Sequence, residues 1–302
     1  MKQQSPIGVF DSGVGGLSIA KTIHNLMPNE NVIYIADHLY SPYGNKSTET
    51  LQQRTSLIID YFVSRDCKAI VVACNTATVH TIAYLRQLTD IPIIGVEPAL
   101  KPASELSKTG VVGLLATQQT INSDSLLNLK SRFEDRVNVQ LVACPLFVEL
   151  VEQGKLDSAE TKQAITHYIQ GLIDQDIDHL VLGCTHYAFL IPTINQCIKQ
   201  LTNKPVTIIE PSYPVCLELQ RQLENRNLLS SHDILDSAPE SRSSKRIGVF
   251  EFFSTQKDKG SIVLDLNSLF SLLWQQQVHV QTIELGTNTT NEFFRTTAEN
   301  RK

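Results

Sequence analysis

Two short segments of this chain resemble each other, and both end in a cysteine. An aliphatic run over 69–73 leads to Cys74, and a similar run over 179–183 leads to Cys184, 110 residues further along. Each cysteine is followed by a small polar residue of a type that can begin a helix. This pattern is typical of a buried strand that leads directly into a helix in an α/β protein.

Two further pairs of segments repeat in the same order. The segment 7–12 resembles 112–117, and the segment 94–98 resembles 208–211, at offsets of 105 and 113 residues. An offset of this size corresponds to one small α/β domain. We therefore expect two related halves, each with one thiol at the carboxyl end of a strand. The two thiols could then face opposite sides of one small substrate.

Short apolar runs alternate with longer amphipathic stretches, which predicts a mainly parallel sheet flanked by helices in each half. We expect strands over 6–10, 31–36, 69–73, 92–96, 111–115, 138–142, 179–183, 206–210 and 247–253. We expect helices over 15–27, 47–65, 77–89, 98–107, 120–133, 145–153, 158–175, 187–202, 214–226 and 261–276. Ligands of such sheets bind beyond the carboxyl ends of the strands. The polar residues at that edge would be Asp11, Asp37, Cys74, Glu97, Cys184 and Glu210.

The predicted fold is therefore α/β, with two pseudo-symmetric domains and the active site in the cleft between them. The first domain is expected to be discontinuous, with residues 1–98 and 211–302, and the second to hold residues 99–210. The serine-rich segment 230–245 is expected to form a surface loop, and the polar tail from Gly286 is expected to fray.

Composition and charge exclude several classes of protein. A net charge of −5 and a pI near 5.9 do not give the excess of basic residues that is typical of nucleic-acid-binding proteins, so we expect no nucleic-acid partner. No apolar run is long enough for a signal peptide or a membrane span, so we expect a cytoplasmic protein. None of the six cysteines forms a Cys-x-x-Cys pair, which disfavours a structural zinc site, and we expect free thiols and no metal.

The position of each repeated cysteine suggests a reactive thiol. The positive end of a helix favours an anion, so we expect the pKa of Cys74 and of Cys184 to be lowered towards neutrality. His186, two residues after Cys184, could assist proton transfer there. The alternatives are that these cysteines are buried hydrophobic residues, and that the histidine only caps a helix or packs in the core.

The segment 11–16 is a glycine-rich turn between a strand and a helix, and its amides could bind a carboxylate or a phosphate. Asp37 would suit a ribose-binding acid of a dinucleotide site. However, the Gly-x-Gly-x-x-Gly pattern fails at Ser18, and a charged Asp11 would repel a pyrophosphate. We therefore expect no dinucleotide cofactor; a simple helix cap is the alternative role for Asp11.

Together these segments resemble the glutamate racemases of the aspartate/glutamate racemase family. The resemblance extends from about residue 7 to residue 285, and Glu149 stands where the family usually has proline. The matching segments are 8–17, 43–44, 74–77, 95–98, 144–148 and 183–187, which include Asp-Ser-Gly-Val-Gly-Gly and Cys-Thr-His-Tyr.

The resemblance implies racemisation of L-glutamate to D-glutamate for peptidoglycan synthesis, without pyridoxal phosphate, another cofactor or a metal. It implies that Cys74 and Cys184 are the acid/base thiols, Cys74 acting on D-glutamate and Cys184 on L-glutamate. Asp11 would support Cys74, and Glu152 with His186 would support Cys184. A homodimer is expected, with glutamate as the small-molecule partner. The implied substrate contacts are Asp11, Ser12, Tyr43, Gly44, Asn75, Thr76, Thr185 and His186.

Racemisation suits paired thiols, because a base must remove the α-proton from one face while an acid returns a proton to the other. One alternative is a racemase of another small amino acid, such as aspartate, on the same scaffold. A hydrolase or transferase with a cysteine nucleophile would need only one thiol, and a non-catalytic binding module would need neither.

Overall fold

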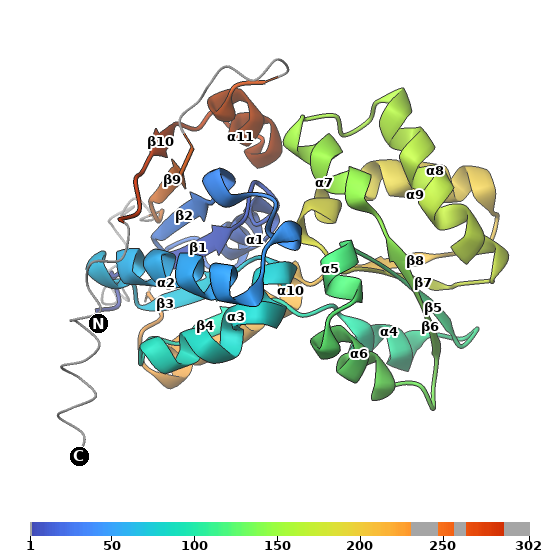
Figure 1. Cartoon of the computed structure of the whole chain (residues 1–302), viewed down its shortest axis with the longest axis horizontal. Helices are drawn as coiled ribbons and strands as arrows, with labels where there is room; N and C mark the ends of the chain where they lie inside the picture. Colours follow the sequence, from blue (N-terminus) through green and yellow to red (C-terminus); the bar gives the residue numbers. More distant parts are fainter. Residues whose placement is uncertain (1, 231–246, 257–263, 287–302) are drawn as a thin grey trace, which may run out of the picture.

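The computed structural model describes residues 2–230, 247–256 and 264–286, and its strands form two parallel sheets (Figure 1). The first sheet has the order β10-β9-β2-β1-β3-β4, and the second has the order β6-β5-β7-β8. The strands of the first sheet are β1 (Ile7–Asp11), β2 (Val32–Ala36), β3 (Ala69–Val72), β4 (Ile93–Gly95), β9 (Phe250–Ser254) and β10 (Val280–Thr282). Those of the second are β5 (Val111–Ala116), β6 (Asn138–Ala143), β7 (His179–Leu182) and β8 (Thr207–Ile209).

The strand order confirms the repeat found in the sequence. The order β2-β1-β3-β4 in one sheet is matched by β6-β5-β7-β8 in the other. The register also agrees: Gly8 of β1 pairs with Ile70 of β3, and Gly113 of β5 pairs with Leu180 of β7. Equivalent residues of the two halves therefore occupy equivalent places at the edges of the two sheets. The predicted α/β fold with two pseudo-symmetric halves is confirmed.

The helices follow the predicted alternation with strands. The α-helices are α1 (Leu17–Leu26), α2 (Thr48–Ser64), α3 (Asn75–Leu88), α4 (Leu100–Leu106), α5 (Gln118–Ile121), α6 (Asp124–Ser131), α7 (Pro145–Glu152), α8 (Ala159–Asp174), α9 (Ile191–Leu201), α10 (Ser212–Asn225) and α11 (Leu266–Trp274). Short 3-10 helices are η1 (His38–Tyr40), η2 (Tyr43–Asn45) and η3 (Thr185–Leu190). In the described parts of the chain, no helix is both long and apolar enough to span a membrane.

Two predicted helices differ from the structure. The helix expected over 120–133 is two helices, α5 and α6, because the side chains of Thr117 and Ser123 each accept a backbone N–H and begin a new helix. The helix expected over 187–202 begins as the 3-10 turn η3, and α9 starts at Ile191 with a proline in its first turn.

Both faces of β1, β2 and β3 in the first sheet are buried, which explains why these strands are continuous apolar runs. On β1, Ile7 and Val9 belong to one hydrophobic cluster, and Phe10 belongs to another on the opposite face. The cluster of Ile7 also includes Val151 of α7 and Tyr187 of η3, from the other half of the chain. A continuous core therefore joins the two halves.

The strands of the second sheet all lie between residues 111 and 209, between the two sets of strands that form the first sheet. This arrangement is compatible with the predicted domain division, whose boundaries stay a prediction. The predicted loop 230–245 lies, after Ser230, outside the described residues, as does the tail beyond Gly286.

Candidate active site

A cavity of about 230 Å³ lies where the carboxyl ends of strands from both sheets meet. It is lined by segments that follow β1 and β3 of the first sheet and β5 and β7 of the second. Both repeated cysteines and all eight predicted substrate contacts line it. The lining residues are Asp11, Ser12, Pro42, Tyr43, Gly44, Asn45, Cys74, Asn75, Thr76, Thr117, Gln118, Gln119, Pro145, Val148, Glu149, Cys184, Thr185 and His186.

Cys74 follows β3 and caps α3, where its Sγ accepts the backbone N–H of Ala77 at 3.5 Å. The thiol also lies 3.8 Å from the hydroxyl of Ser12, which in turn donates to Asp11. Burial and the nearby Asp11 carboxylate raise the pKa of Cys74 well above its usual value. The expected lowering was wrong for this thiol, because these two effects outweigh the helix N-terminus.

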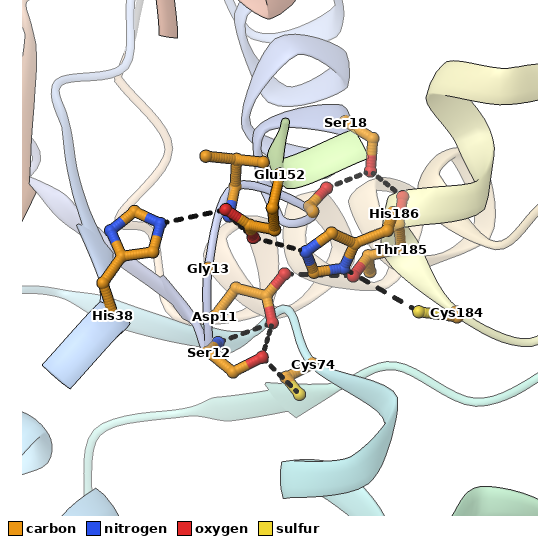
Figure 2. Close-up of polar contacts among 12 residues, drawn as sticks. Asp11, Ser12, Gly13, Ser18, His38, Cys74, Glu152, Cys184, Thr185 and His186 are labelled. Atoms are coloured by element: carbon orange, nitrogen blue, oxygen red, sulfur yellow. Dashed lines mark hydrogen bonds and ion pairs between the residues drawn. The ribbon is translucent and has the colours of Figure 1, made fainter. Parts of the chain in front are cut away.

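Cys184 follows β7, and its thiol faces His186, which in turn contacts Glu152. Its Sγ lies 3.8 Å from Nδ1 of His186, whose Nε2 lies 2.7 Å from Oε1 of Glu152 (Figure 2). Burial by itself would lower the pKa of His186, but the hydrogen bonds to Cys184 and Glu152 raise it well above its usual value. Burial by itself would raise the pKa of Glu152, but hydrogen bonds from His186 and His38 hold it well below its usual range.

The glycine-rich turn 13–16 binds a carboxylate of the protein itself. The backbone N–H of Val14 donates to Oε1 of Glu152 at 2.9 Å. A Cβ atom at Gly13 would lie 1.9 Å from that same oxygen, and one at Gly15 would lie 2.3 Å from Nδ1 of His186. Glycine is therefore required here because side chains of the second half approach the backbone closely.

Asn75 and Thr185 complete the polar wall of the cavity. Asn75 is 3% exposed, and neither its amide nitrogen nor its amide oxygen has a hydrogen-bond partner among the described residues. A buried amide left without partners is costly, which indicates that a polar ligand supplies them. The hydroxyl of Thr185 donates to Oδ2 of Asp11 at 3.0 Å and so connects the two halves across the site.

Three acidic residues predicted at the strand edge do not line this cavity. Asp37 is fully buried and forms an ion pair of 2.6 Å with Arg54. It also accepts the hydroxyl proton of Tyr43 at 2.6 Å, and so holds that side chain at the cavity wall. Glu97 and Glu210 are likewise not among the residues that line the cavity.

Several residues of the site were not predicted from the sequence. Thr117 follows β5 as Ser12 follows β1, so the repeat contained a signal for it; Gln118 and Gln119 come directly after. His38 contacts Glu152 at 3.2 Å, and no spacing in the sequence indicates this contact. Glu149 is an exposed residue at the cavity and does not interrupt α7, whose helical bonding continues through it to Gln153.

Two thiols that follow equivalent strands and line one cavity define a racemase-like site in a pseudo-symmetric α/β protein. The model of the Asp/Glu/hydantoin racemase family matches residues 8–212, and the chain belongs to this family. Its relatives at 40% identity and above are glutamate racemases, so it is an amino-acid racemase, an isomerase.

Similar proteins cover nearly the whole chain. A glutamate racemase of Pseudomonas entomophila (strain L48) is 40% identical over 285 residues, which are 94% of this chain and 99% of that protein. The structure of glutamate racemase isoform RacE1 from Bacillus anthracis has a TM-score of 0.77 at 30% identity and covers 95% of this chain and 100% of its own. The glutamate racemase of Francisella tularensis subsp. tularensis SCHU S4, in complex with D-glutamate, has a TM-score of 0.76 at 27% identity, with the same coverage.

The close approach at the glycine turn leads to a prediction for Gly13→Ala. The added methyl group would displace the Glu152 carboxylate, because it would lie 1.9 Å from Oε1. We expect racemase activity to fall by about a hundredfold, as a small misplacement of a catalytic group can cost this much. Circular dichroism of the product enantiomer gives the rate. Gly171→Ala is the matched control, since a Cβ there meets nothing within 4 Å, and it should leave the rate unchanged. Equal rates for both variants would contradict the role of the turn.

The raised pKa of Cys74 leads to a prediction about pH. Only the thiolate is alkylated, so the rate for Cys74 should rise about tenfold per pH unit between pH 7 and 9 without a plateau. Asp11→Asn removes the charge that disfavours the thiolate and should speed the reaction at pH 7. Mass spectrometry after iodoacetamide treatment measures the rate. Asp60→Asn, on α2, is the control and should have no effect; a plateau below pH 8 in the unsubstituted protein would show that the pKa is not raised.

Proposed function

We propose that this protein interconverts L- and D-glutamate with two thiols, one acting as base and the other as acid. The observation that carries the proposal is that Cys74 and Cys184 follow equivalent strands and line the same cavity. A substrate held between them would present one face of its α-carbon to each thiol. The roles of the two thiols would exchange with the direction of the reaction.

Each thiol has its own group to assist proton transfer. On the Cys74 side, the Ser12 hydroxyl connects the thiol to the Asp11 carboxylate. On the other side, Glu152 is an acceptor only, so Nε2 of His186 carries a proton and Nδ1 faces Cys184. Nδ1 would take the proton of Cys184 when this thiol acts as base, and would return it when the thiol acts as acid. By the family resemblance, Cys184 would act on L-glutamate and Cys74 on D-glutamate.

Polar groups of the cavity would bind the substrate and stabilise the charge that develops when the α-proton leaves. The unpartnered amide of Asn75 would both donate to and accept from the substrate. The hydroxyls of Ser12, Thr76 and Thr185 are further donors, and Tyr43 with Gly44 would form the wall opposite. Asp11 and His186 would contact the substrate as well as assist the thiols.

Glutamate is favoured as substrate because the similar proteins are glutamate racemases and one was solved with D-glutamate bound. Aspartate, one methylene shorter, is the alternative. By the same resemblance, the enzyme would supply D-glutamate for peptidoglycan synthesis in the cytoplasm, as a homodimer without an added cofactor. We also propose the domain division into 1–98 with 211–302 and 99–210.

The reaction is tested directly by chiral chromatography. Purified protein treated with a chelator is incubated with L-glutamate and no cofactor, and in parallel with L-aspartate. Formation of D-glutamate alone supports the proposal. Formation of D-aspartate alone would change the substrate and keep the mechanism, and inertness towards both would overturn the proposed function.

The two-thiol mechanism makes a sharper prediction for Cys74→Ser and Cys184→Ser. Each variant should lose racemisation by about a thousandfold or more, since one of the two proton transfers lacks its thiol. Cys74→Ser should still exchange the α-proton of L-glutamate with solvent deuterium, and Cys184→Ser that of D-glutamate, as followed by NMR. Cys197→Ser, a buried cysteine outside the cavity, is the control. Near-full activity of either site variant would exclude the two-thiol assignment.

A further inference from the structure

Glu152 is held from a second side by a histidine outside the cavity. His38 is the first residue of η1, directly after β2 and Asp37, and its side chain is 10% exposed. Its Nε2 lies 3.2 Å from Oε2 of Glu152, and its Nδ1 lies 2.9 Å from the hydroxyl of Ser254 at the end of β9. Figure 2 shows His38 and His186 on opposite sides of the Glu152 carboxylate.

We propose that His38 is a positioning residue for the Cys184 half of the reaction, which fixes the Glu152 carboxylate so that His186 faces the Cys184 thiol. The inference rests on the proposed function. His38 does not line the cavity and would contact neither the substrate nor the reacting thiol. It would act only through the hydrogen-bonded series from Ser254 to Glu152, His186 and Cys184.

The Glu152 carboxylate fixes which nitrogen of each neighbouring histidine carries a proton. An ionised carboxylate only accepts hydrogen bonds, so His38 carries a proton on Nε2 and donates it to Glu152. In the neutral ring, Nδ1 then accepts from the Ser254 hydroxyl; in the charged ring it donates to it. The same reasoning places a proton on Nε2 of His186. Glu152 thus receives a histidine N–H on each of its two oxygens, and the two rings are held in defined orientations.

The two oxygens of Glu152 are not equally well held. Oε1 accepts from both the backbone N–H of Val14 and Nε2 of His186. Among the described residues, Oε2 accepts only from His38. Loss of His38 would therefore leave one carboxylate oxygen free to turn towards water, because that side chain is 22% exposed. Rotation of the carboxylate would also move Oε1 and so misalign His186 relative to Cys184.

The effect should be confined to one thiol. Cys74 is contacted by Ser12 and by the N–H of Ala77, and neither group contacts Glu152. Cys184 is contacted by His186, which contacts Glu152 directly. A purely structural role for His38 would instead disturb both sides of the cavity.

The first experiment compares two substitutions at the same position. His38→Gln keeps an N–H donor near the place of Nε2, whereas His38→Asn is too short to reach Glu152. We expect kcat/KM for glutamate racemisation to fall about tenfold in His38→Asn, as a hydrogen bond to a charged group is lost, and to stay within about threefold in His38→Gln. Equal loss in both variants, or no loss in either, would overturn the proposal.

The matched control is His179→Asn. His179 forms a similar pair with Asp178 at 2.9 Å, and its side chain is also 10% exposed, but it lies at the opposite end of β7 from Cys184. This variant should keep the original rate. If His179→Asn loses as much activity as His38→Asn, then the loss of any such histidine–carboxylate pair lowers the activity, and the proposal fails.

The second experiment separates the two half-reactions, because enantiomers have equal free energies and overall kcat/KM cannot differ with direction. His38→Asn is added to Cys74→Ser and to Cys184→Ser, and solvent exchange of the α-proton is measured. We expect about tenfold slower exchange in the Cys74→Ser background, where Cys184 acts, and no change in the Cys184→Ser background. Equal slowing in both would overturn the proposal.

Two further measurements distinguish failure of this inference from a folding defect and from failure of the proposed function. If His38→Asn does not fold, Ser254→Ala removes the other partner of the His38 ring and should show the same selectivity with a smaller loss. If the unsubstituted protein does not racemise glutamate at all, the proposed function fails. Iodoacetamide then still tests the geometry: Cys184 should react more slowly in His38→Asn, with Cys74 unchanged, and equal rates for Cys184 would overturn the inference.

Discussion

The Glu152 carboxylate is the group on which the rest of the site depends. It ends α7 in the second half of the protein, yet it accepts a backbone N–H from the glycine turn of the first half. The same carboxylate fixes His186, which faces Cys184. A half-buried carboxylate with so many donors stays ionised, so it holds the two halves in register and sets the tautomer of the neighbouring histidine.

The pseudo-symmetry of the two halves does not extend to the side chains that contact the two thiols. Strand order and register are equivalent in the two halves, so both thiols reach the same edge. Their partners differ, however: Cys74 has the fully buried Asp11 nearby, where the second half has Ala116, and Cys184 has His186. Equivalent strand positions therefore place the two thiols beside different groups, a carboxylate on one side and a histidine on the other.

Much of this arrangement could be predicted from the sequence. Each of the first eight predicted strands is present to within one or two residues, and every predicted substrate contact lines one cavity. The lowered pKa expected for Cys74 was wrong, because a helix N-terminus is a local feature whereas burial and the Asp11 charge come from the fold. The single helix expected over 120–133 was wrong because Ser123 begins a second one.

The sequence by itself determined the strands, the repeat and the set of residues that follow each strand, because apolar periodicity and helix-starting residues act over a few positions. Only the tertiary structure decided which of these residues meet. Glu152 is 34 residues from His186 and 114 from His38, and it meets both through packing between the two halves. Contacts of this kind depend on how the sheets and helices pack, and the local spacing of residues in the sequence does not indicate them.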